Sequence, residues 1–285
     1  MKSPMPHLIT SSIAALIGVT CLACGSSEAE EARTWATSSS APALYWHIYE
    51  PVAVAQGEST FGDAACPVTS DDGTVLTIRG ECTTTEGQRR FGTATVTRGA
   101  SEGDLSITLD GYGSDNDLGE VRTTGTATIT RREADLHEFT LDLTVVGTST
   151  ARIDYEGTVR GRYDAPTTWN GTGSIERSGF APTGRVLATT LDERFDSEVC
   201  SGQPLSGSTT MVREGRIDVI TYDGETDCDM ARAAQWSVDG TPRGPLADIS
   251  CSARPGARSP FAVATAVLAG LAYLVRRARR TRLSA

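Results

Sequence analysis

Apolar residues alternate with threonine, serine or charged residues in short segments that recur from Phe91 to Arg177. In Leu105-Ser-Ile-Thr-Leu109, every second residue is apolar, and Phe139-Thr-Leu-Asp-Leu143 repeats the pattern. A period of two is typical of β-strands that have one face in a core and the other in water. The central part of the chain is therefore predicted to be all-β.

Turn sequences rich in glycine, aspartate and serine separate these segments, as at Asp71-Asp-Gly73. The predicted strands cover residues 74–79, 91–98, 104–110, 121–131, 137–146, 151–163, 168–177, 184–190, 207–213, 216–222 and 233–238. Because no helical pattern is long enough for a crossover, consecutive strands are expected to pair antiparallel as one meander. About ten strands do not stay in a flat open sheet, so we expect the meander to curl into a barrel or fold into a sandwich.

The residues before the predicted strands divide into two segments of different composition. Residues 24–41 are mainly serine, alanine, glutamate and threonine, with little to bury, and are interpreted as an acidic tether. Residues 42–61 are rich in aromatic and aliphatic residues, so we expect a short helix or first strand that packs on the sheet. The aromatic side chains are expected in the core rather than in a ligand platform. The β domain is thus predicted over residues 42–250.

The first 23 residues are typical of a secretory signal peptide. Lys2 precedes an apolar run from Ile13 to Leu22 that is too short to span a membrane. The segment ends in Cys21-Leu-Ala-Cys24-Gly-Ser-Ser27, which resembles the bacterial lipoprotein signal. This resemblance implies cleavage before Cys24 and a diacylglycerol on its sulfur. Cleavage nearby by an ordinary signal peptidase is the alternative.

Residues 251–285 contain a cysteine, a short apolar segment and a basic cluster, in that order. Cys251 is followed by the uncharged apolar run 261–275 and by five arginines within residues 276–282. This order resembles the C-terminal sorting signal of myxobacterial surface proteins called MYXO-CTERM. The resemblance implies that the tail is cleaved and that an anchor is attached at Cys251, a second lipidation site. A plain hydrophobic helix with its basic end in the cytoplasm is the alternative.

The remaining cysteines favour an oxidising compartment. If Cys24 is lipidated and Cys251 is reserved for the tail, Cys66, Cys82, Cys200 and Cys228 remain. Cys66 and Cys82 flank the predicted hairpin at residues 71–73, and Cys200 and Cys228 flank the strand pair 207–222. We therefore predict the disulfides Cys66–Cys82 and Cys200–Cys228.

The charge of the chain disfavours a nucleic-acid partner. All 36 acidic residues lie between Gly25 and Arg258, whereas Lys2 and the five C-terminal arginines lie outside that region. The body is therefore more acidic than the net charge of -10 of the whole chain. Phosphate binding needs a basic surface, which this composition does not favour.

Several polar residues are candidates for chemistry. Gly99-Ala-Ser-Glu-Gly103 matches the G-x-S-x-G pattern, but the segment after it is strand-like, so Ser101 is expected in a hairpin loop. His47 and His137 are the histidines available as bases, and the acids Asp142, Asp154, Glu156 and Asp164 are candidates for glycan hydrolysis. The oxygen-rich loop with Asp110, Asp115, Asp117 and Glu120 is a candidate Ca²⁺ site that lacks the EF-hand spacing, and no other cofactor is expected.

Together these features predict an exported protein, anchored in the cell envelope of a diderm bacterium, at the outer membrane or cell surface. We expect a structural or interaction role without catalysis, with a membrane and an envelope or extracellular component as partners. The body also resembles uncharacterised secreted proteins of myxobacteria, which implies no activity. A carrier that encloses an apolar ligand in a β-barrel cavity is the first alternative, and a hydrolase of glycans or esters is the second.

Overall fold

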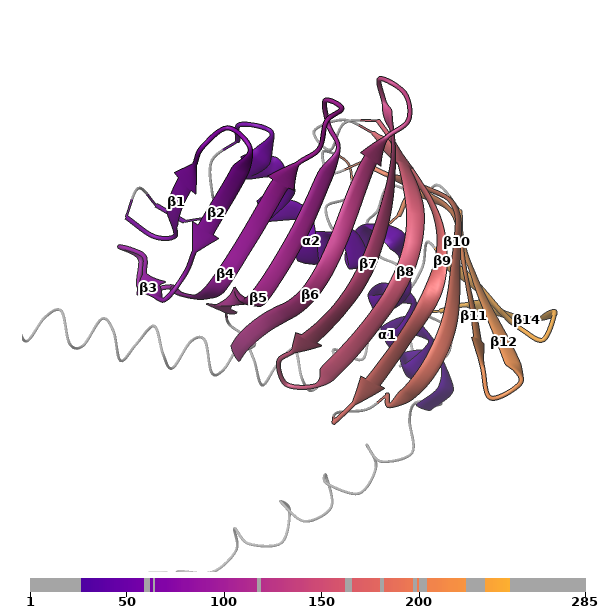
Figure 1. The fold of residues 1–285 in the computed structure, drawn as a ribbon. Helices are drawn as coiled ribbons and strands as arrows, with labels where there is room; N and C mark the ends of the chain where they lie inside the picture. The colour runs from indigo at the N-terminus through magenta and orange to yellow at the C-terminus, as the bar shows by residue number, and fades with distance from the viewer. Residues whose placement is uncertain are drawn as a thin grey trace, which may run out of the picture. The chain divides into compact units, whose positions relative to one another are not determined.

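One antiparallel sheet of 14 strands dominates the computed structural model of the protein (Figure 1). The structure describes residues 27–58, 62–63, 65–116, 119–161, 166–179, 182–196, 199, 204–223 and 234–246. The strands are β1 Val68–Asp71, β2 Val75–Arg79, β3 Cys82–Thr83, β4 Arg89–Arg98, β5 Leu105–Asn116, β6 Gly119–Arg131, β7 Leu136–Val146, β8 Thr150–Arg160, β9 Thr167–Ser178, β10 Gly184–Phe195, β11 Ser206–Arg213, β12 Arg216–Asp223, β13 Ala234–Val238 and β14 Thr241–Pro245. Each strand pairs with its neighbours in the chain, except that β3 pairs with β4 beside β2. The predicted antiparallel meander is therefore confirmed.

The alternation in the sequence becomes the two faces of the sheet. Ile107 and Leu109 of β5 and Leu141 and Leu143 of β7 are buried on one face. The other face carries threonines, and the hydroxyl groups of Thr128 and Thr140 lie 2.7 Å apart across β6 and β7. The inner row therefore packs in a core while the outer row contacts solvent.

Two helices lie against the inner face of the sheet, and the sheet curls around them (Figure 1). Helix α2 spans Ala41–Ala55 and buries Leu44, Ile48 and Val52, which recur at helical spacing on one side. This confirms the expected helix packed on the sheet. The expectation that its aromatic side chains lie in the core is confirmed for Tyr45 but is wrong for Trp46, which is 53% exposed. Among the described residues, no helix is long and apolar enough to cross a membrane.

Helix α1 corrects the interpretation of residues 24–41 as a tether. It spans Ser27–Ser39, and Ala32, Trp35 and Ala36 on one side are buried with at most 1% of their surface exposed. Alanine has the highest helix propensity and lets a helix approach the sheet closely, so little apolar surface suffices. The folded domain therefore includes residues 27–41, which the prediction placed in the tether.

The sheet also differs from the predicted barrel or sandwich. Its order runs from β1 at one edge to β14 at the other, so the described strands form an open sheet. Helix α2 contacts β4, β5, β9 and β10, and α1 contacts β11. The helices cover the apolar face that would otherwise need a second sheet or closure of the first.

A cluster of aromatic rings attaches α2 to the middle of the sheet. The ring of Tyr45 lies 5.4 Å from that of Phe139 and 5.1 Å from that of Trp169, both edge to face. The ring of Tyr155 stacks on Phe139 at 6.2 Å. Such arrangements are favourable for aromatic pairs and add to the burial of apolar area.

Glycine on β9 makes room for this cluster. A Cβ atom at Gly171 would lie 2.5 Å from Cε1 of Tyr155. We expect Gly171→Ala to lower the free energy of unfolding by about 1–3 kcal/mol, because the ring must leave its position. Gly147→Ala is the matched control, since its nearest contact would be 3.4 Å away. Equal melting temperatures for the two variants would contradict this explanation.

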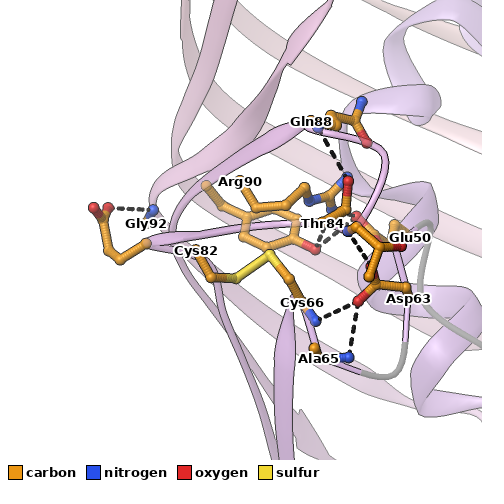
Figure 2. Close-up of a disulfide and its surroundings, with 12 residues drawn as sticks. Glu50, Asp63, Ala65, Cys66, Cys82, Thr84, Gln88, Arg90 and Gly92 are labelled. Carbon is orange, nitrogen blue, oxygen red and sulfur yellow. Dashed lines mark hydrogen bonds and ion pairs between the residues drawn. A yellow bond between two sulfur atoms is a disulfide. The ribbon is translucent and has the colours of Figure 1, made fainter.

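A disulfide joins Cys66 to Cys82 and closes the loop that contains the β1–β2 hairpin (Figure 2). This is the first of the two pairings predicted from the sequence. Asp63 lies beside it and accepts hydrogen bonds from the backbone N–H groups of Ala65 at 2.8 Å and Cys66 at 2.9 Å (Figure 2). Hydrogen bonds from the backbone, chiefly that of Thr85, lower the pKa of Asp63 to about 2.

We expect Cys66→Ser combined with Cys82→Ser to lower the free energy of unfolding by about 3 kcal/mol, because the cross-link restricts a 16-residue separation in the unfolded chain. Urea unfolding with and without reductant measures the effect. Without reductant the double variant should unfold at a lower urea concentration than the natural chain, and reductant should lower the midpoint of the natural chain until this difference disappears. An unchanged midpoint for both proteins would contradict a stabilising role for this disulfide.

The predictions for both ends of the chain and for the second disulfide lie outside the described residues. These are the signal peptide with Cys24, the segment 251–285 with its hydrophobic helix, and the pair Cys200–Cys228. They remain predictions.

Candidate functional site

A buried ion pair fastens α2 to the sheet near the disulfide. The carboxylate of Glu50 on α2 pairs with the guanidinium of Arg90 on β4, and their side chains are 7% and 4% exposed (Figure 2). The hydroxyl of Tyr112 on β5 donates to Glu50 at 2.6 Å and accepts from Nη2 of Arg90 at 3.0 Å. Burial, and then the charge of Glu50, raise the pKa of Tyr112. The phenol therefore stays protonated and serves to position the pair.

A second ionic cluster fastens α1. Asp218 on β12 is fully buried and accepts hydrogen bonds from Arg216 at 3.0 Å, from Arg213 at 3.3 Å and from Nε1 of Trp236 at 3.0 Å. Arg213 also pairs with Glu31 on α1. The helices are thus held at defined positions on the inner face, and the spaces left beside them have defined walls.

The first such space is a cavity of about 320 Å³ at the C-terminal end of α2. Tyr45, Tyr49 and Trp169 give it an aromatic wall, and His137 lies at the beginning of β7. Burial, followed by the charge of Arg131, lowers the pKa of His137, so this imidazole is neutral at pH 7. The cavity therefore offers aromatic surface and few charges.

The second space is a cavity of about 480 Å³ at the opposite ends of β7, β8 and β9, beside α1 and the start of α2. Val145, Ile153 and Ile175 of the sheet form its apolar wall, and Arg33 of α1 and Arg177 of β9 supply charge. His47 of α2 also lines it, and burial lowers the pKa of this histidine to about 4.

The described residues of the candidate Ca²⁺ loop belong to strands rather than to a loop. Asp110 and Asp115 lie on β5, and Glu120 lies on β6, where its carboxylate binds Arg122. Asp117 is outside the described residues. No group of three acidic, histidine or cysteine side chains converges as a metal site within the described ranges.

The other candidates for chemistry are dispersed. Ser101 is exposed in the turn between β4 and β5, as the sequence predicted. Asp142 and Asp154 face each other across β7 and β8 on the exposed outer face, and Glu156 is exposed farther along β8. His47 and His137 line the two cavities, on the inner face of the sheet. Neither the serine nor these acids therefore share a cavity with a histidine. Asp164 lies outside the described residues.

Sequence reasoning missed the residues that form the ionic and cavity sites. Glu50, Arg33 and Glu31 belong to helices. Their partners are at least 40 residues away, on strands for Glu50 and Glu31 and directly after β14 for Arg33. Glu50 is a single charged residue on the apolar side of its helix. This position could have indicated a buried ion pair, because a buried charge requires a partner. The positions of Arg33 and Arg177 in the sequence do not indicate that the two residues line the same cavity.

Comparison of the chain with protein-family models, with curated proteins and with solved structures finds no match.

Proposed function

We propose that this protein is exported to the cell envelope of a diderm bacterium, is held to a membrane through Cys24 or through its C-terminal segment, and acts there by binding. The observation that carries the export proposal is the disulfide between Cys66 and Cys82. Disulfides persist in oxidising compartments and are rare in reducing ones. The signal-like residues 1–23 supply an independent argument for the same location.

Binding is favoured over catalysis by the way the folded domain is built. Ionic clusters and aromatic rings fix the two helices on the sheet, and the cavities beside them combine apolar and polar side chains, with aromatic rings in the first. Such a composition is typical of small-molecule binding sites. The candidate nucleophile and acids of the sequence lie instead on an exposed turn and on the outer face.

Thiol trapping in intact cells combined with fractionation tests export. Cells are treated with a membrane-permeant maleimide, and the protein is then recovered from membrane and soluble fractions. We expect the protein in the membrane fraction, with Cys66 and Cys82 labelled only after reduction. Recovery from the cytosol with both thiols labelled before reduction would overturn the proposal.

A carrier of an apolar ligand is the second candidate function. Its binding site would be a cavity beside the helices rather than the interior of a barrel. The first cavity favours it, because Tyr45, Tyr49 and Trp169 form an aromatic wall around about 320 Å³. The neutral dye N-phenyl-1-naphthylamine should bind with increased fluorescence, and Ala134→Trp at the exposed mouth should reduce binding. Glu133→Gln is the control on the same exposed turn. Equal dye binding by the two variants would exclude this cavity as the site.

A further inference from the structure

The second cavity is lined by both apolar and basic residues. Val145, Ile153 and Ile175, all less than 10% exposed, form its apolar wall from the inward rows of β7, β8 and β9. The hydroxyl-bearing residues Thr34, Thr37 and Ser38 of α1 also line it. The volume of about 480 Å³ is within the range of sites that hold small organic molecules.

Among the described residues, the ionisable side chains that line this cavity are all basic or potentially basic. They are Arg33, Arg177 and His47, and none of the described lining residues is a carboxylate. Two of the three acids of α1 pair elsewhere, Glu31 with Arg213 and Glu28 with Arg216, and the third, Glu30, is exposed and outside the lining. The positive charge at the cavity is therefore not neutralised by its own lining.

Both guanidinium groups have donors left without partners. Nε of Arg33 and Nη1 of Arg177 are buried and have no hydrogen-bond acceptor among the described residues. Arg33 is fixed by a 3.3 Å bond from Nη2 to the carbonyl of Leu246, and the guanidinium of Arg177 lies 5.6 Å from the ring centre of Trp35. These two atoms have almost no accessible surface, so an anion in the cavity would contact the other nitrogens of the two half-buried guanidinium groups and lower the cost of burying their charge.

We propose that this cavity binds a single-chain amphiphile with an anionic head group. The head group, a carboxylate or a phosphate, accepts hydrogen bonds from Arg33 and Arg177, as guanidinium groups do in other anion sites. The alkyl chain lies along Val145, Ile153 and Ile175 and removes their surface from water. This inference goes beyond the envelope location and does not depend on either anchor, because every residue that it uses lies in the described domain.

Isothermal titration calorimetry on the full chain, kept soluble in an amphipathic polymer, tests the ligand class. The probes share an eight-carbon chain and differ in head group: octanoate, octyl phosphate, octanol and octylammonium. Acetate tests the head group alone. We expect octanoate or octyl phosphate to bind at least tenfold more tightly than octanol, octylammonium and acetate. The stronger of the two anions identifies the head group.

Variants test the two arginines. Arg177→Gln and Arg33→Gln should each weaken binding of the preferred anion about tenfold and leave binding of octanol unchanged, because each removes one charged donor. Arg152→Gln is the matched control, since Arg152 is exposed on the outer face of β8 and should not change either affinity. Using both arginine variants keeps the test decisive if one of them fails to fold.

Three results would overturn the inference: no binding of either anion, equal affinity for octanoate, octyl phosphate and octanol, or the same loss of anion affinity in Arg152→Gln as in the cavity variants. A cytosolic location would overturn the export proposal and leave these affinities untouched. The two proposals can therefore fail separately.

Discussion

Glu50→Gln should lower the free energy of unfolding by about 3–5 kcal/mol, because it leaves the charge of Arg90 buried without a counter-ion. The two side chains are 7% and 4% exposed, so water cannot replace the lost carboxylate. The hydroxyl of Tyr112 would also lose the carboxylate that accepts its proton at 2.6 Å. Urea unfolding of the full chain, followed by circular dichroism, measures the loss.

An exposed ion pair provides the control for this prediction. Arg132 and Glu138 are 54% and 46% exposed, so Glu138→Gln should change the free energy of unfolding by less than about 1 kcal/mol. Replacing both buried partners, as Glu50→Leu with Arg90→Met, should cost less than Glu50→Gln alone, since no unpaired charge remains. If Glu50→Gln and Glu138→Gln unfold at the same urea concentration, the buried pair does not fasten α2.

Glu193→Gln should stabilise the protein at pH 8, by about 4 kcal/mol relative to the natural chain. Glu193 is fully buried on β10, and Thr209 donates its hydroxyl proton to the carboxyl group. Burial is the main cause that raises the pKa of Glu193, from 4.5 to about 8. The folded state therefore holds a proton that the unfolded chain has already released at neutral pH.

The sign of the effect follows from proton linkage. Between pH 4.5 and about 8 the folded state binds one more proton at Glu193 than the unfolded state, so the stability of the natural chain falls as the pH rises. Glutamine cannot ionise, so the variant should lose this slope. Glu156→Gln, at an exposed position on β8, should keep it. Parallel stability curves for the natural chain and Glu193→Gln from pH 5 to pH 8 would contradict a protonated Glu193.

His47 should lower the stability of the protein at acidic pH. Burial lowers the pKa of His47 to about 4, below its ordinary value of 6.5. The unfolded chain therefore takes up a proton at His47 before the folded state does, and stability falls as the pH drops from 6.5 towards 4. Because the two opposite slopes cancel where they overlap, both groups together favour a plateau of stability between about pH 4.5 and pH 6.5.

The strands were predictable because their pattern is local. Each strand predicted between residues 74 and 238 overlaps a strand of the structure. The predicted strand ended at residue 110, but β5 continues through Gly111–Gly113, with an irregular register opposite β6 and a positive φ of 59° at Gly111. Glycine permits this conformation in a bulge as readily as in a turn, so composition does not distinguish the two.

The covering of the sheet was not predictable from the same pattern. Alternation shows that one face is buried but does not show what buries it, and a second sheet, closure and helices all satisfy that need. Helix α1 was not predicted because its buried side consists largely of Ala29, Ala32 and Ala36. These residues give little difference in hydrophobicity between the two sides of the helix. The spacing of these alanines around Trp35 was the signal available.

The residues that line the two cavities could not be predicted from the sequence, for a related reason. Arg33 and Arg177 are 144 positions apart in the sequence, with α2 and strands β1 to β8 between them, and their proximity depends on where α1 lies on the sheet. The disulfide between Cys66 and Cys82 was predictable because both residues flank one hairpin. Contacts between residues close in the sequence could therefore be predicted for this chain. Contacts between the helices and the sheet could be found only from the structure.

Intact-mass spectrometry of the protein purified from membranes tests the proposed export and anchoring most directly. We predict a chain that begins at Cys24, carries the mass of a lipid on that residue and contains Cys66 and Cys82 as a disulfide. A chain that ends near Cys251 with an added anchor would support the C-terminal signal as well. A full-length chain that starts at Met1, without lipid and with both cysteines reduced, would contradict export.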